Sequence, residues 1–250
     1  MMTLRPLPFL VAFFFFTAEN DHSYAQGTLQ QILNNGPTDK RINIVVLSEG
    51  YTSSQLAQFF IDASTTLDRM LTNQPLSEYR PYFNGFVISV ASNESGSDHP
   101  SRNITRDTYF NSSYGTSGLE RLVTINSAGS ARASALLQQL MPEYDIVIVL
   151  VNDTEYGGSG GSYLISSMHT SSAEIATHEL GHSFAHLGDE YSDAYPGYPD
   201  FEEPNTTRET QRDQIKWRGW IIGSTPIPTP ATNDYATLVG LFEGAHYHAT

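Results

Sequence analysis

The stretch His178-Glu179-Leu180-Gly181-His182 says more about fold and chemistry than any other part of this 250-residue chain. Two histidines at positions i and i+4 of a helix turn their imidazoles toward one point, where a divalent metal ion can be held. The carboxylate of Glu179 lies beside that point and can take a proton from a water molecule at the metal. Two surface histidines on a solvated helix give the same pattern by chance, so the surroundings decide its meaning.

The residues around the motif are typical of one amphipathic helix over about residues 172 to 187. Ser171 and Glu174 have the spacing of a capping box, which satisfies free N–H groups in the first helical turn. Opposite the two histidines the helix has an apolar face made of Ala176, Leu180, Phe184 and Leu187. An apolar back on a core and two histidines facing a cleft are what a hydrolytic metal site requires.

A catalytic zinc site needs a third protein ligand and an open position. His186 is a poor candidate, because at about 1.5 Å per residue it lies roughly 12 Å along the helix axis from His178. Gly188 can end the helix in the left-handed conformation and let the chain turn back. Asp189 is therefore the first choice for the third ligand, and Glu190 is the alternative. His186 is assigned a supporting or structural role.

The first 25 residues have the pattern of an export signal rather than of a folded segment. Arg5 precedes an apolar stretch, Leu7 to Ala18, and Ser23-Tyr24-Ala25 fits a small-x-small cleavage site. The apolar stretch is too short to span a bilayer as a stable helix. We therefore predict a signal peptide over residues 1–25 and a mature protein that is secreted or periplasmic, with no membrane attachment after cleavage.

The composition limits the possible partners and chemistry. The chain has no cysteine, which excludes a thiol nucleophile, a thiolate metal ligand and disulfides. Thirteen basic against 27 acidic residues give a formal net charge of −14, which argues against nucleic acid and anionic membranes as partners. The mature length suffices for one sizeable core. With no repeat or clear boundary, we expect one catalytic domain over residues 26–250.

Buried apolar runs alternate with helical patterns along the chain, which predicts an α/β fold with a mixed, partly parallel sheet. Strands are expected at residues 43–47, 86–90 and 145–151. Helices are expected from a capping box at Thr52 and Gln55 to Leu71, and over residues 131–141. Gly157 to Gly161 lacks the lysine and helix of a phosphate-binding loop, and is expected to reverse the chain into a short strand, Tyr163 to Ser166.

That short strand leads into the metal helix, so we expect an exposed edge that pairs with an extended peptide substrate. The predicted substrate contacts are Tyr163, Leu164 and Ile165. A hydrogen bond to the oxyanion can come from Tyr191, or from the late residues His246 and Tyr247.

A polar loop follows the second strand, from Ser92 to Pro100. Its oxygen-rich side chains can coordinate a calcium ion, while a solvated loop is the simpler interpretation. Calcium is therefore a second candidate cofactor beside zinc.

These segments resemble the IgA-specific metallopeptidase family of exported bacterial enzymes over about residues 42 to 250. The motifs that carry the resemblance are Ser48-Glu49-Gly50-Tyr51-Thr52, Tyr82-Phe83-Asn84, Glu94-Ser95-Gly96 with Asp98, Tyr156 to Gly161, His178 to Tyr191, Glu203-Pro204-Asn205 and Ile215-Lys216-Trp217. The resemblance implies a zincin-like zinc endopeptidase with His178, His182 and Asp189 as ligands and Glu179 as general base. Named members cleave immunoglobulin A, but the name assigns no substrate to this chain.

The resemblance also implies further chain after residues 239–244, and many related enzymes place a methionine turn under the metal. The last methionine here is Met168, which precedes the metal helix. We therefore expect the sequence to be truncated at its C-terminus.

The predicted function is a secreted zinc-dependent endopeptidase that acts on a protein or peptide, with Glu179 as general base. The alternative is a non-catalytic protein that binds a glycan or a protein on the same fold. The presence of Glu179 argues against that alternative, because only catalysis requires its carboxylate. A zinc hydrolase of small amides or cell-wall peptides is a third interpretation.

Overall fold

The computed structural model describes residues 27–189 and 201–245. The predicted signal peptide, the alternative ligand Glu190 and the predicted oxyanion donors Tyr191, His246 and Tyr247 lie outside the described residues. In the part of the chain that is described, no helix combines the length and the apolar character needed to cross a bilayer.

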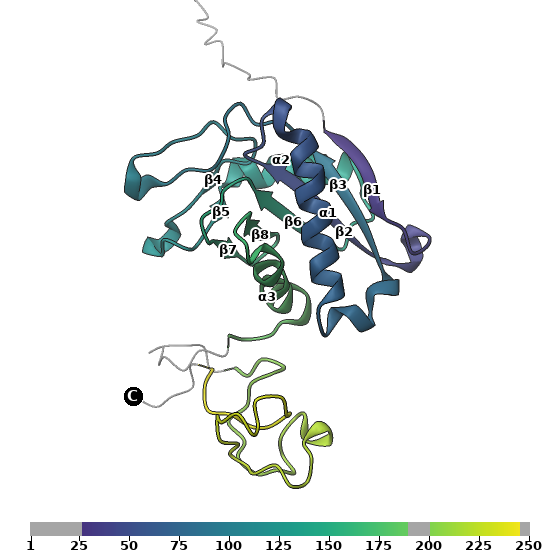
Figure 1. Ribbon diagram of the computed structural model, residues 1–250, viewed down its shortest axis with the longest axis vertical. Helices are drawn as coiled ribbons and strands as arrows, with labels where there is room; N and C mark the ends of the chain where they lie inside the picture. Colours follow the sequence, from purple (N-terminus) through teal and green to yellow (C-terminus); the bar gives the residue numbers. More distant parts are fainter. Residues whose placement is uncertain (1–26, 190–200, 246–250) are drawn as a thin grey trace, which may run out of the picture.

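A six-stranded sheet with the order β1-β3-β2-β6-β8-β7 forms the centre of the protein (Figure 1). The inner strands are parallel to one another: β2 (Ile42–Glu49), β3 (Phe83–Ser89), β6 (Ile146–Val151) and β8 (Leu164–Ser167). The outer strands run antiparallel to their neighbours: β1 (Thr28–Leu33) and β7 (Gly158–Ser159). The mixed α/β sheet expected from the sequence is present, and the three predicted apolar strands are part of it.

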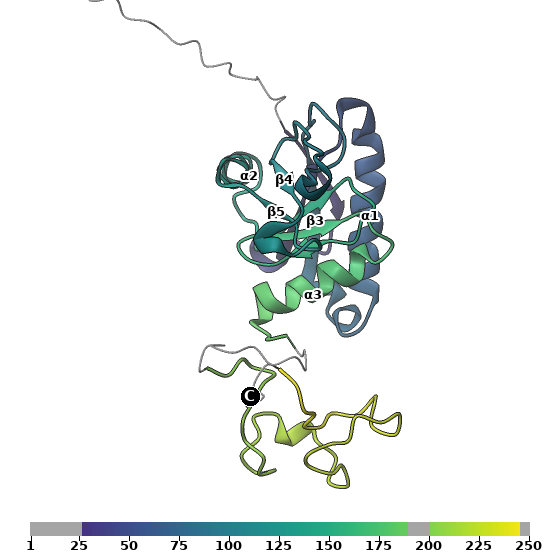
Figure 2. The same cartoon turned by 90° about the vertical axis from the view of Figure 1, so that its left-hand side faces the viewer.

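Helices cover both faces of the sheet, which gives three layers (Figure 2). Helices α1 (Leu56–Thr72) and α3 (Ser172–Ala185) pack on one face, and α2 (Ser127–Leu140) packs on the other. Val46 of β2 belongs to the core under α1 and α3, whereas Val45 and Leu47 belong to the core under α2. Because β2 and β6 are buried on both faces, they are continuous apolar runs in the sequence.

Polar side chains set the starts of two helices. Thr52 and Gln55 form the predicted capping box, in a 3₁₀ turn directly before α1. Helix α2 begins earlier than predicted, because Asn126 caps it by accepting a hydrogen bond from the Gly129 N–H at 2.8 Å. The loop before α2 carries a small antiparallel pair, β4 (Ser112–Ser113) and β5 (Thr124–Ile125).

The prediction that Tyr163 to Ser166 forms an exposed edge strand is wrong. Strand β8 pairs with β6 on one side and with β7 on the other. Leu164 and Ile165 are only 3% and 4% exposed, and the Tyr163 hydroxyl donates a hydrogen bond to the Ser130 carbonyl at 3.3 Å. The reason is that the glycine-rich segment does more than reverse the chain, since it joins the sheet as β7. Strand β8 is therefore not an edge strand, and β7 occupies the edge at Ile165 and Ser166.

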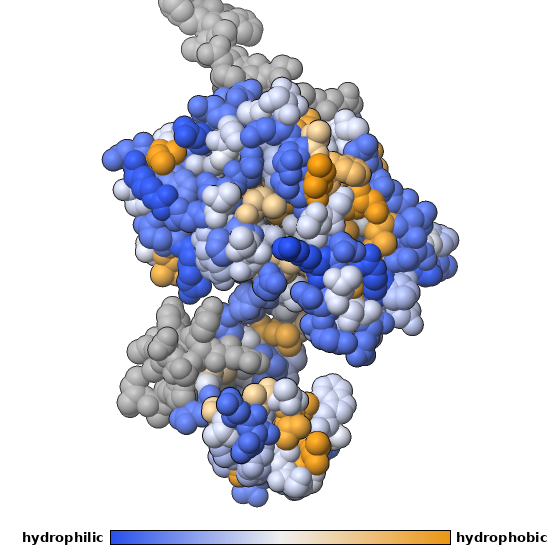
Figure 3. Space-filling model, in the orientation of Figure 1, coloured by the Kyte–Doolittle hydropathy of each residue, from blue (hydrophilic) through white to orange (hydrophobic). Residues whose placement is uncertain are grey.

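Residues 201–245 form an irregular segment beyond the end of α3 and away from the sheet (Figures 1 and 2). A 3₁₀ turn, Arg218–Trp220, is the one helical element within this range. Apolar side chains gather on its surface (Figure 3), and the exposed ones include Ile222, Val239 and Phe242.

Candidate metal centre

Helix α3 turns its histidines away from the core, as the sequence predicts. Small and apolar residues on its other side are buried against α1 and the sheet, namely Ala173, Ala176 and Leu180. The side chains of His178 and His182 are 49% and 24% exposed. Phe184 and Leu187, which were also expected on the apolar face, are exposed. The reason is that the last turn of α3 projects beyond the sheet (Figure 2).

Both ends of α3 differ from the prediction. The Ser171 side chain makes no capping hydrogen bond, so the expected box with Glu174 does not form. The helix ends at Ala185, and His186 is the left-handed residue that ends it, with φ 54° and ψ 35°. Gly188, which was expected in this role, is not among the residues with positive φ. His186 is thus an exposed turn residue.

The turn at His186 brings Asp189 back to the two histidines. The Nε2 atoms of His178 and His182 lie 3.1 Å apart, and Oδ1 of Asp189 is 3.3 Å from each of them. Among the described residues, these three side chains are the one group of three or more histidine, aspartate or glutamate residues placed to share a metal ion.

The chemistry of the three atoms fits a metal cation. Oδ1 of Asp189 is buried and has no hydrogen-bond partner. Nδ1 of His182 lies 2.7 Å from the carbonyl oxygen of Leu187. When Nδ1 donates its proton there, the lone pair of this ring is on Nε2, which faces the other two atoms. Two imidazole nitrogens and a carboxylate oxygen are a donor set for divalent transition metals, and a cation relieves the repulsion among their lone pairs.

Glu179 is half-buried beside this group, against the glycine-rich segment. A Cβ atom on Gly160 would lie 2.8 Å from Oε2 of Glu179, and one on Gly158 would lie 3.6 Å from Oε1. The two glycines therefore leave the space that the carboxylate occupies. Burial raises the pKa of Glu179, while the nearby imidazoles of His178 and His182 act in the opposite direction.

A family model for the IgA peptidase M64 family matches residues 30–238 of the chain. The chain belongs to the IgA peptidase M64 family. The matched range includes the whole sheet apart from the start of β1, the metal centre and most of the irregular segment. The protein is therefore a metallopeptidase, a hydrolase that acts on proteins or peptides. A comparison with curated proteins found no match.

In this M64 peptidase, Asn205 fixes the backbone at Gly188, directly before Asp189. The Gly188 N–H donates to Oδ1 of Asn205 at 2.8 Å, and Nδ2 of Asn205 donates to the Gly188 carbonyl at 3.0 Å. A Cβ atom on Gly188 would lie 2.7 Å from Cδ of Glu203, so a close approach requires glycine there. Nζ of Lys216 donates to the carbonyls of Glu203 and Thr206, each at 2.8 Å. Glu203, Asn205 and Lys216 stand in the motifs that carry the family resemblance, but nothing in those motifs indicates these contacts.

The polar loop at residues 92–100 uses its carboxylates for backbone contacts. Oε2 of Glu94 accepts a hydrogen bond from the Asp107 N–H at 2.8 Å, and Oδ1 of Asp98 accepts one from the Arg106 N–H at 2.6 Å. These contacts occupy oxygens that a calcium ion would need. Among the described residues, no second group of three acidic or histidine side chains has its ligand atoms close enough together to share a metal ion.

Proposed function

We propose that this M64 metallopeptidase is an exported, zinc-dependent endopeptidase with Glu179 as its general base. The observation that carries the proposal is the approach of three ligand atoms, from His178, His182 and Asp189, to within 4.8 Å of one another. Zinc is favoured because a set of three nitrogen and oxygen ligands with an open fourth position is typical of its catalytic sites. The export pattern of residues 1–25 supports a secreted or periplasmic location.

His178, His182 and Asp189 would hold the zinc ion, and the bound ion would supply a water molecule of lowered pKa, about 7, and a Lewis acid for the scissile carbonyl. Glu179 takes the proton from the attacking water and passes it to the nitrogen of the leaving amine. Its place on the same helix as both histidines fixes its carboxylate beside the reacting atoms. The contact between Nδ1 of His182 and the Leu187 carbonyl holds that imidazole in one orientation.

Two features support an endopeptidase that acts on extended protein segments. The His178 side chain is half-exposed, so among the described residues nothing encloses this part of the ligand group. The formal net charge of −14 favours neutral or cationic segments over acidic ones.

The proposal is tested with an unfolded protein substrate, with and without a chelator. We expect the chelator to stop cleavage and added zinc to restore it. Glu179→Gln should keep the fold and the zinc content while turnover falls by about 10² to 10⁴, the usual effect of a positioned general base. Full activity in that variant would remove Glu179 from the mechanism. A zinc-loaded wild-type chain that cleaves no protein substrate would favour the non-catalytic binding protein.

A further inference from the structure

A cavity of about 490 Å³ lies at the carboxyl edge of the parallel strands, and no residue of the metal centre lines it. Asp153 in its wall follows β6, and the Gly96 N–H in its wall donates to the carbonyl of Gly50, which follows β2, at 3.0 Å. Strands β2 and β6 are neighbours from which the chain proceeds outward in opposite directions, to β3 and to β8. In open parallel sheets, ligands bind at this point of reversal.

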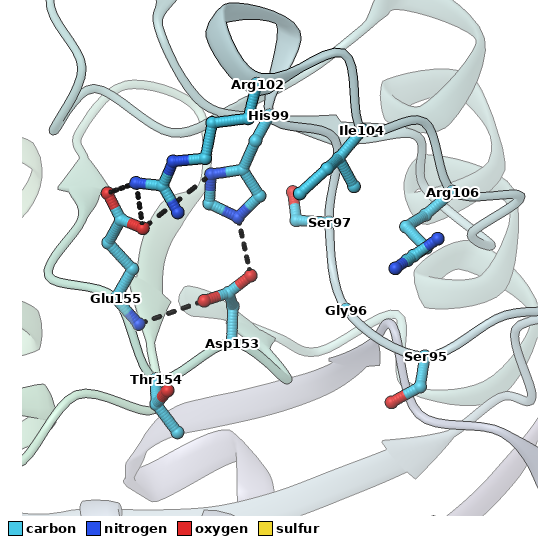
Figure 4. A pocket seen from close by; sticks show the side chains of 10 residues that line it. All are labelled: Ser95, Gly96, Ser97, His99, Arg102, Ile104, Arg106, Asp153, Thr154 and Glu155. Carbon is cyan, nitrogen blue, oxygen red and sulfur yellow. Dashed lines mark hydrogen bonds and ion pairs between the residues drawn. The ribbon is translucent and has the colours of Figure 1, made fainter.

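Two polar pairs occupy one side of the cavity. Nε2 of His99 lies 2.8 Å from Oδ2 of Asp153, and the Arg102 guanidinium lies 2.5 Å from the Glu155 carboxylate. Figure 4 shows both pairs side by side, with a further approach of the His99 ring to Glu155. Both carboxylates on this side thus have partners within the protein, so a ligand must find its partners on the other side of the cavity.

Arg106, an exposed residue, places a positive charge on that other side. Its guanidinium makes one long hydrogen bond, to the Thr105 carbonyl at 3.5 Å, and it forms no ion pair with any residue that the structure describes. Figure 4 shows this guanidinium across the cavity from Arg102. In a chain with a formal net charge of −14, an arginine without an acidic partner beside a cavity is a site for an anionic group.

Ser97 provides an unused hydrogen-bond donor in the same wall. The residue is 1% exposed, and its hydroxyl has no hydrogen-bond partner. A buried hydroxyl without a partner costs free energy, which a ligand oxygen would recover. The wall of the cavity therefore contains both a charged side chain without an ion pair among the described residues and a buried hydroxyl without a hydrogen-bond partner.

We propose that this cavity binds a small ligand through a carboxylate group, with the charge of Arg106 and a hydrogen bond from Ser97. One guanidinium matches one negative charge, and its planar donors suit a carboxylate. A phosphate dianion fits less well, because its second negative charge has no second cation beside Arg106 to match it. The volume suits a ligand of the size of a blocked amino acid or dipeptide, with Ile104 as an apolar contact. The site is separate from the metal centre and does not depend on its activity.

The probes are N-acetylglycine and N-acetylglycinamide, which differ only in the carboxylate. Each is titrated into the full chain, and binding is followed by nuclear magnetic resonance. We expect the amide to bind at least about tenfold more weakly than the acid. Arg106→Gln should weaken binding of the acid by about the same factor, and Ser97→Ala should weaken it less. The matched control is Arg69→Gln, an exposed arginine on α1, which should leave binding unchanged.

Equal binding of the acid and the amide would overturn the proposal. Binding of the acid that Arg106→Gln does not weaken would also overturn it, because the carboxylate would then bind elsewhere, such as at the metal centre. Inorganic phosphate that binds more tightly than N-acetylglycine would overturn the assignment of a carboxylate. Thermal unfolding of each variant shows that a loss of binding is not a loss of fold.

Discussion

Asn205 holds Gly188 by two hydrogen bonds, one from the Gly188 N–H at 2.8 Å and one to the Gly188 carbonyl at 3.0 Å. The second bond reaches the peptide group that joins Gly188 to Asp189. A residue of the irregular segment 201–245 thereby sets the position of the third proposed ligand. Hydrogen bonds just outside a metal's ligands orient those ligands, and their loss lowers metal affinity.

Asn205→Ala is expected to lower zinc affinity by about 10-fold to 100-fold, because the N–H and the carbonyl of Gly188 both lose their side-chain partner. Asn205→Asp keeps an acceptor for the Gly188 N–H and should lose less. Competition with a chromophoric chelator measures the affinities. Asn233→Ala, in the same segment, is the matched control and should bind zinc as the wild type does. Unchanged affinity in Asn205→Ala would show that Asp189 is positioned without this contact.

Gly188→Ala tests the close approach to Glu203. The backbone can accept alanine because φ is not positive, so any damage must come from the new Cβ, 2.7 Å from Cδ of Glu203. We expect a loss of about 1–3 kcal/mol in the free energy of unfolding, together with weaker zinc binding. Gly181→Ala in α3 is the control, since its Cβ would meet only Cδ1 of Leu187 at 3.5 Å. Identical urea unfolding of the two variants would contradict the steric argument.

Gly160→Ala tests the space reserved for Glu179. The new Cβ would lie 2.8 Å from Oε2 of the carboxylate, which must then move. A displaced general base should lower turnover by about tenfold or more while zinc content stays unchanged. Gly223→Ala is the control, because its Cβ would meet no atom within 4 Å. Normal turnover of Gly160→Ala would mean that Glu179 works from another position.

Glu49 is a fully buried carboxylate outside the metal centre. It accepts hydrogen bonds from the Thr108 hydroxyl at 2.6 Å and from the N–H groups of Phe110 and Ser112, each at 2.8 Å. Burial nevertheless raises the pKa of Glu49 above its ordinary value of 4.5. A raised pKa in the folded state means that folding favours the protonated form. The stability gained is complete below about pH 4.5 and is lost as the pH rises through the raised value.

Glu49→Gln is expected to remove this pH dependence and to destabilise the fold by about 1–3 kcal/mol. The reason is that the new NH₂ group would face hydrogen-bond donors that now point at the carboxylate oxygens. Urea unfolding at a series of pH values above 4.5 measures both effects. Glu78→Gln, at an exposed position, is the control and should keep the wild-type curve. If the curves of Glu49→Gln and the wild type stay parallel at all pH values, the raised pKa plays no part in stability.

The part of the metal site that depends only on helix geometry could be predicted from the sequence. The spacing of His178 and His182 alone directs both rings to one point, and the structure brings Asp189 to the same point. The turn between them was assigned to the wrong residue, because a left-handed histidine has only a weak sequence preference. The close approach of Gly188 to Glu203 was not predictable, since the two residues are 15 positions apart in the sequence and meet only through tertiary structure.

The sheet shows the same limit. Strands β2 and β6 were predicted because burial on both faces leaves a continuous apolar run. Strand β7 was missed because Gly158 and Ser159 have low strand propensity, and only their pairing with β8 makes them a strand. Without β7, Leu164 and Ile165 were mistaken for a free edge.

The zinc content of chains purified without chelator, measured by elemental analysis, tests the assignment of His178, His182 and Asp189 most directly. The wild type and Glu190→Ala should each contain about one zinc ion per chain, as a three-ligand catalytic site requires. Asp189→Ala should contain much less. A wild-type chain without stoichiometric zinc would contradict the proposed centre. Zinc retained in Asp189→Ala but lost in Glu190→Ala would contradict Asp189 as the third ligand.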